Sequence, residues 1–109
     1  MQIDTTRMRG VCVVLLDGKL DSNASADFEA HLQTLLDDGA ERIIIDLAKV
    51  DFVTSSGLRV LLATAKRIKH LDGDLCVCDL NQTVREVFDI SGFSTLLNVF
   101  NSLQEALDA

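Results

Sequence analysis

The stretch Asp51–Leu62, DFVTSSGLRVLL, decides the fold because it places two serines and a glycine between a predicted strand and a predicted helix. The apolar run Arg42–Leu47 precedes it. Apolar residues then recur at the spacing of one helix face, at Leu58, Leu61, Leu62, Ala65 and Ile68. Ser55 and Ser56 are therefore expected where a strand leads into a helix. Functional residues collect in such loops, and the free N–H groups of a helix start suit a hydroxyl cap or a phosphate.

Apolar and β-branched runs predict further strands on both sides of this junction. Gly10 allows a tight turn between the first two strands, so that pair is expected to be antiparallel. Asp17-Gly18 is expected to end the second strand. The predicted strands are residues 2–7, Val11–Leu16, Arg42–Leu47, Leu75–Cys78 and a short run at Leu96–Phe100.

Helix signals alternate with these strands, because N-cap residues precede each apolar helical face and turn residues follow most of them. The start signals are Asp21-Ser22-Asn23, Ser55-Ser56, Asn81, and Ser102 with Glu105; the stop signals are Gly39, Asp72-Gly73 and Gly92. This alternation predicts an α/β fold with a mixed, mostly parallel sheet of four to five strands and packed helices. Residues 1–109 are predicted to form one domain.

Charge and composition narrow the classes of function. The 109 residues carry a formal net charge of −7, which disfavours nucleic acid and anionic membranes as partners. No apolar run approaches the roughly 20 residues of a membrane span. The N-terminus lacks the charged and apolar regions of a signal peptide, and three cysteines are too few for a disulfide scaffold. We therefore expect a cytoplasmic protein.

Four segments together resemble the anti-sigma factor antagonists of the STAS family. The turn Thr54–Leu58 is similar to the Asp-Ser-Ser-Gly-Leu or Ser-Ser-Ala-Gly-Leu turn that precedes a helix in these proteins. Gly18–Asp21 is similar to their Gly-Glu-Leu-Asp turn, Ile44–Leu47 to their central strand, and Val87–Phe93 to a late helix end. The segments occur in the family's order and cover nearly the whole chain. Thr54 is a departure, because some members carry Asp there, and it bears on which kinase recognises the site.

The resemblance implies a partner-switching adaptor and no enzyme. In such proteins the serine at the position of Ser55 is phosphorylated by a partner kinase. The unmodified protein is then expected to bind a serine-kinase anti-sigma factor and to release it when Ser55 is phosphorylated. The expected partners are this kinase and a serine phosphatase, with no cofactor. The resemblance implies that Asp21 faces the kinase, and partner binding is also expected at Thr54, Ser55, Ser56 and Gly57.

The same residues have structural alternatives. Either serine can simply cap the helix, which is worth about 1 kcal/mol. Gly57 costs about 1 kcal/mol inside a helix relative to alanine, which indicates a close approach by backbone or by a partner, or a tight turn. Asp21 can be a cap, Asp46 can accept a strand-end hydrogen bond, and Asp51 can be a turn residue. Because Asp46 ends one predicted strand and Asp21 follows the end of another, both are expected near Ser55.

Two other functions compete with the adaptor. A receiver-like domain would carry phosphate on Asp46, but it needs an acidic pair after an early strand and a lysine after a late one, and the sequence has neither. A serine hydrolase would need a base for Ser55 or Ser56. Only His31 and His70 are available, and the Gly-x-Ser-x-Gly pattern is absent.

The cysteines and histidines predict no metal site. Cys76 and Cys78 share one face of a predicted strand, and only Cys12 can be added to them. A structural zinc site needs four ligands, so a histidine would have to come from elsewhere. Buried strand cysteines are the better interpretation.

Overall fold

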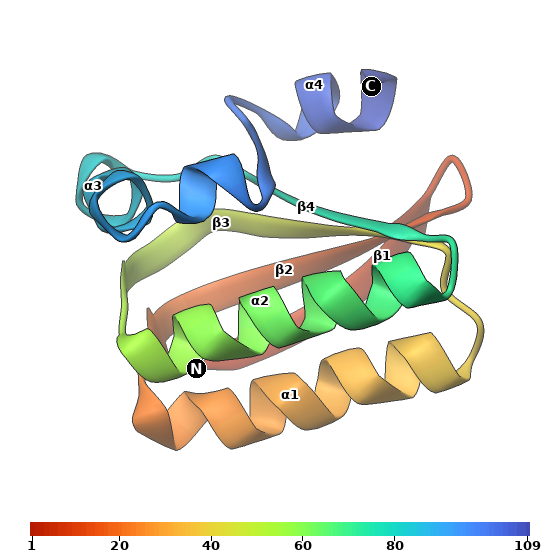
Figure 1. Ribbon diagram of the computed structural model, residues 1–109, viewed down its shortest axis with the longest axis horizontal. Helices are drawn as coiled ribbons and strands as arrows, with labels where there is room; N and C mark the ends of the chain where they lie inside the picture. Colours follow the sequence, from red (N-terminus) through yellow and green to blue (C-terminus); the bar gives the residue numbers. More distant parts are fainter.

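The computed structural model describes residues 1–109 and contains a five-stranded mixed sheet (Figure 1). β1 runs antiparallel to β2, and the remaining neighbours are parallel. The strands lie in chain order across the sheet: β1 (Gln2–Met8), β2 (Val11–Leu20), β3 (Arg42–Val53), β4 (Asp74–Cys78) and β5 (Asn98–Phe100). The predicted α/β class, the mixed sheet and the antiparallel first pair are confirmed.

The helices divide between the two faces of this sheet. Figure 1 shows α1 (Ser22–Asp37) and α2 (Ser55–His70) side by side on one face, with α4 (Leu103–Asp108) on the other. Between β4 and β5 lie α3 (Gln82–Ser91) and a single 3-10 turn, η1 (Phe93–Thr95). None of the helices combines the length and apolar character needed to cross a membrane.

The core follows from the alternation of side chains along the central strands. In β3, Ile43, Ile45 and Leu47 join the larger apolar cluster, which also holds side chains from α1, α2 and α3. Ile44 points to the opposite face, where a smaller cluster with Ala106 lies under α4. Because both faces of β3 and β4 are covered, these strands read as continuous apolar runs rather than alternating ones.

Two strands, β2 and β3, continue several residues beyond their predicted ends. β2 continues through Asp17-Gly18 to Leu20, so the prediction that this dipeptide ends the strand is wrong. The pairing of β2 with β3 shifts register between Leu15 and Asp17 and again between Gly18 and Leu20, and Gly18 has a φ of 123°. These irregularities interrupt the apolar pattern while the backbone remains paired. β3 likewise continues beyond Leu47, to Val53.

Local capping chemistry explains where three of the helices begin. The side chains of Asp21, Asn81 and Ser102 accept hydrogen bonds from backbone N–H groups in the first turns of α1, α3 and α4. α3 ends at Gly92, whose left-handed conformation has a φ of 79°. The remaining helix, α2, begins without a side-chain cap.

Candidate functional site

Two helix starts lie side by side at one edge of the sheet. β2 leads into α1 through Asp21, and β3 leads into α2 through Thr54. Since β2 and β3 are parallel neighbours, their carboxyl ends meet at the same edge, where Figure 1 shows the starts of α1 and α2 together. The Oγ atoms of Ser22 and Ser56 are 3.2 Å apart and join the two starts by a hydrogen bond.

The start of α2 is anchored through Thr54 rather than capped by a serine. The N–H and Oγ1 of Thr54 both donate to the carbonyl oxygen of Leu20, at 3.0 and 3.3 Å. Thr54 occupies the N-cap position without a side-chain cap hydrogen bond, and the helix begins at Ser55. The interpretation of Ser55 or Ser56 as a side-chain cap is therefore wrong.

Gly57 allows α2 to lie against the end of β2. It is buried, and a Cβ built on it would lie 2.6 Å from Leu20 Cγ and 2.9 Å from the Leu20 carbonyl oxygen. Neither contact is compatible with a side chain, and the second is with backbone. Of the alternatives that the sequence left open, close backbone approach is the one that the geometry supports.

Ser55 is the accessible hydroxyl of this edge. It is exposed and its Oγ makes no hydrogen bond within the protein, whereas Ser56 is half-buried and bonded to Ser22. The first helical hydrogen bond runs from Leu58 N–H to Thr54 O at 3.0 Å. The N–H groups of Ser55, Ser56 and Gly57 therefore have no backbone acceptor, and those of Ser55 and Ser56, which are not buried, remain available to water or an anion.

An acidic groove of about 560 Å³ adjoins the start of α1. Its lining includes Asp21, Asp27 and Asp51, with Lys19 as the one basic residue. The Oδ1 of Asp21 accepts from Ala24 N–H at 3.0 Å, so the capping alternative for Asp21 is correct. The structure thus brings Asp21 and Asp51 to one groove, at the edge where the serines begin α2.

Asp46 does not belong to this edge, and the expectation that it lies near Ser55 is wrong. β3 continues well past it, so Asp46 sits within the strand, on the face opposite α1 and α2. It is 9% exposed and accepts a hydrogen bond from Ala48 N–H at 2.9 Å. Burial raises the pKa of Asp46, and the nearby Asp79 carboxylate adds to this, while the Ala48 N–H and Lys49 oppose it.

Asp46 instead forms a cluster with Cys78 and Asp79, whose ligand-type atoms all lie within 4.8 Å of one another. Cys78 and Asp79 are adjacent in the sequence, but Asp46 joins them only through the pairing of β3 with β4, so no local motif contains all three residues. They are the residues with the geometry to face a metal ion. Burial, together with the charges of Asp46 and Asp79, raises the pKa of the Cys78 thiol, which favours the protonated sulfur over the thiolate that a metal needs.

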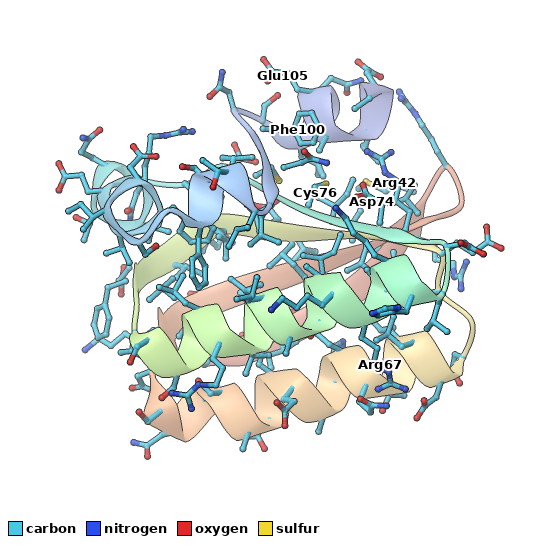
Figure 2. All side chains as sticks on the ribbon, viewed as in Figure 1. Arg42, Arg67, Asp74, Cys76, Phe100 and Glu105 are labelled. Carbon is cyan, nitrogen blue, oxygen red and sulfur yellow. The ribbon has the colours of Figure 1, made fainter.

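The two strand cysteines are buried as predicted. Cys76 and Cys78 are fully covered beneath α4, and Figure 2 shows Cys76 and Phe100 between the sheet and that helix. Burial raises the pKa of Cys76 to about 11, against the opposing charge of Arg42.

Neither histidine lies where a serine hydrolase would need it. His70 is the last residue of α2, at the opposite end from Ser55. His31, on α1, hydrogen-bonds through Nε2 with the hydroxyl of Thr5 on β1. The arrangement therefore pairs neither imidazole with a serine of the α2 start.

Comparison with known proteins places this chain in a family. Residues 2–106 match the model of the STAS domain. BtrV of Bordetella bronchiseptica, described as an anti-sigma factor antagonist, is 37% identical over 109 residues, which cover 100% of this chain and 94% of BtrV. The anti-sigma F factor antagonist of Paenibacillus polymyxa is 32% identical over 108 residues, covering 98% of this chain and 92% of that protein.

Solved structures agree with these sequence matches. SpoIIAA of Bacillus, an anti-sigma factor antagonist, has been solved without phosphate (TM-score 0.83) and in a phosphorylated form (TM-score 0.75). In both cases the identity is 25% and 98% of this chain is covered, with 94% and 97% of the respective SpoIIAA chains. The chain belongs to the STAS family, among the anti-sigma factor antagonists.

Proposed function

We propose that this chain is a phosphorylation-regulated anti-sigma factor antagonist whose switch is Ser55. Unmodified, it binds an anti-sigma factor that is also a serine kinase; phosphorylated on Ser55, it releases that partner. The observation that carries the proposal is the exposed Ser55 hydroxyl, unbonded and placed at the start of α2. A Bacillus relative with a phosphorylated form supports it.

The fold of this chain would tolerate a phosphate at Ser55. A phosphoserine carries about −1.5 to −2 charges at neutral pH. The free N–H groups of Ser55 and Ser56, together with the partial positive charge of the helix start, stabilise an anion at this point. Phosphorylation is therefore expected to change the surface and to leave the fold intact.

A partner packed on the neutral hydroxyl would not tolerate the same charge. It would have to desolvate the phosphate, and the nearby carboxylates of Asp21 and Asp51 make this edge acidic already. A penalty of about 3–4 kcal/mol lowers affinity by two to three orders of magnitude, which is enough to release a partner.

The other predicted residues would support this contact in different ways. Thr54 and Ser56 fix the start of α2 through Leu20 and Ser22, and the lack of a side chain at Gly57 sets its depth. Asp21 would face the kinase from the acidic groove. A serine phosphatase would restore the binding form, and we place the cycle in the cytoplasm.

The test is phosphorylation of the purified chain by its partner. The kinase is captured from native lysate, incubated with the chain and ATP, and the modified residue is mapped by mass spectrometry. We expect acid-stable phosphate on Ser55, lost in Ser55→Ala and kept in the matched variant Ser22→Ala. Label on Ser56 or Thr54 alone would refute the assignment, and acid-labile phosphate on Asp46 would favour the receiver-like alternative.

A further inference from the structure

We propose that the same partner makes a second contact, in a basic groove along α2 that accepts an acidic, amphipathic segment of the partner. The α2 groove is lined by Leu62, Ala65, Lys66, Lys69 and Leu96 and has a volume of about 150 Å³. This inference rests on the function proposed above, because it names chemistry that the same partner must present.

Charge is distributed unevenly, and α2 is the one helix in which basic residues occur without acidic ones. The chain has a net charge of −7, yet α2 contains no acidic residue. It carries four of the chain's ten lysines and arginines: Arg59, Lys66, Arg67 and Lys69. Arg67 is occupied, because its Nη2 pairs with Asp37 Oδ1 at 3.3 Å between α1 and α2 (Figure 2). Lys66 and Lys69 are exposed and form no ion pair within the protein.

The floor of the α2 groove is apolar and comes from two elements. Leu62 and Ala65 belong to α2, and Leu96 follows η1 and remains 54% exposed. Leu96 is held in place by its N–H, which donates to Phe93 O at 3.0 Å. A single exposed leucine needs no explanation. An exposed leucine that closes a hollow beside two unpaired lysines matches a segment with an apolar side chain flanked by carboxylates.

The α2 groove and the proposed switch residue Ser55 lie on the same helix. At 1.5 Å per residue, Lys66 lies about 16 Å along the helix axis from Ser55. A standard protein interface buries about 800 Å² on each partner, which corresponds to a patch about 30 Å across. A partner docked over Ser55 and the adjoining part of α2 would therefore reach the groove.

The spacing of the two lysines indicates the form of the occupant. Lys66 and Lys69 are three residues apart and share one face of α2, so their ammonium groups fit carboxylates one helical turn apart on a partner. An anionic bilayer is the weaker candidate, because the rest of this acidic chain would be repelled from it. Contacts of this kind mainly raise the association rate and weaken as salt increases.

The experiment compares charge reversal in the α2 groove with an equal reversal elsewhere. The test variant is Lys66→Glu with Lys69→Glu, and the control is Arg7→Glu with Lys49→Glu, which changes net charge equally on β1 and β3. Affinity for the captured kinase is measured by calorimetry at about 0.05 M and about 0.3 M salt. We expect the groove variant to bind about tenfold more weakly at low salt, with a smaller salt dependence, and the control to bind within about twofold of wild type.

Additional variants distinguish a failure of the groove proposal from a failure of the proposed function. Leu96→Asn should weaken binding at both salt concentrations, since it removes apolar floor and no charge. If the groove variants bind like wild type while Ser55→Asp does not, the groove proposal fails and the proposed function stands. If none of these variants changes affinity, the function fails as well. Binding to phosphatidylserine vesicles that is lost in the groove variant, with kinase affinity unchanged, would overturn the proposal in favour of a membrane surface.

Discussion

The start of α2 and the cluster beneath α4 both gather polar residues from neighbouring strands, but they differ in what is left unsatisfied. At the start of α2, Ser55 is exposed and its hydroxyl makes no bond within the protein. On the opposite face, the ligand-type atoms of Asp46, Cys78 and Asp79 lie within 4.8 Å of one another; Cys78 is buried, Asp79 is half-buried and Asp46 lines a hollow of about 310 Å³. The first arrangement leaves a hydroxyl free for a partner, whereas in the second Cys78 is buried and both carboxylates accept hydrogen bonds from backbone N–H groups, so these residues act mainly on the fold. We call the part of the sheet that α4 covers, which includes Cys76 and Cys78, the closed face.

The largest effect that tests this contrast is expected from Ser55→Asp. A carboxylate at the start of α2 is compatible with the helix dipole, so the melting temperature should stay within a few degrees of wild type. Affinity for the kinase should fall by about 100-fold, since the partner must desolvate the charge. Aspartate carries less charge than phosphate, so the loss is smaller than on phosphorylation.

Calorimetry with Ser55→Ala as the control checks this prediction. The alanine variant should bind like the unmodified protein and be insensitive to the kinase and ATP. Equal affinity of the aspartate variant and wild type, or a loss explained by unfolding, would remove Ser55 from the switch.

The second prediction concerns Gly57, which allows the first turn of α2 to lie against the end of β2. Gly57→Ala would place a methyl group 2.6 Å from Leu20 Cγ and 2.9 Å from the Leu20 carbonyl oxygen. Overpacking of this kind costs about 1–3 kcal/mol, and the gain in helix propensity of at most about 1 kcal/mol offsets only part of it. We expect a net destabilisation in urea, together with weaker kinase binding because α2 must move. An increase in stability would mean that Gly57 is not needed for the close approach of α2 to β2.

A third prediction concerns the closed face. Cys76 and Cys78 are fully buried under α4, and the pKa of each is raised, so both should react slowly with a thiol reagent at pH 8. Ala106→Glu introduces a charge into the contact of α4 with the sheet and should accelerate labelling of this pair at least about tenfold. Gln104→Glu, on the exposed side of the same helix, is the control.

Cys12 provides an internal reference in that experiment. It lies in the larger cluster, on the other face of the sheet, and should remain protected if only α4 is released. Rapid labelling of Cys76 and Cys78 in the wild-type protein would show that the face is open rather than closed.

The position of Ser55 at a helix start can be predicted from the sequence, whereas the cluster around Asp46 cannot, for physical reasons. Ser55 lies in a contiguous turn, Thr54–Leu58, whose chemistry and family resemblance are local. The cluster around Asp46 depends on two facts that no local pattern carries: β3 continues to Val53, and its register with β4 puts Asp46 opposite Cys78. Asp79 has a φ of 60°, a conformation that aspartate tolerates but that no local pattern assigns to this position.

The same distinction explains the strand and helix ends. The sequence does not predict the end of β2. The strand shifts its register with β3 twice before Leu20, so its last residues do not follow a regular alternation of apolar and polar side chains. The caps at Asp21, Asn81 and Ser102 were found because each depends on a side chain and N–H groups only three residues away. The start of α2 was misinterpreted because Thr54 bonds to Leu20, a residue distant in sequence.

The smallest effect is expected from Asp46→Asn, which removes charge from the face of the sheet opposite α1 and α2. Because burial raises the pKa of Asp46 in the folded protein, the native state binds more protons than the unfolded state between the unfolded and the folded pKa. Ionised Asp46 therefore lowers the free energy of unfolding at a pH above the folded pKa. This cost is lost as pH falls through the folded pKa and the carboxylate is protonated. The amide oxygen of the introduced asparagine would still accept the hydrogen bond from Ala48 N–H, so we expect a modest gain in stability at pH 7 and a flatter pH dependence between neutral and mildly acidic pH.

Urea unfolding of both proteins across that range measures the difference, and kinase affinity at pH 7 should be unchanged. A loss of stability at pH 7 would mean that the charged form of Asp46 holds this face together, and a loss of kinase affinity would mean that the two faces of the sheet are not independent.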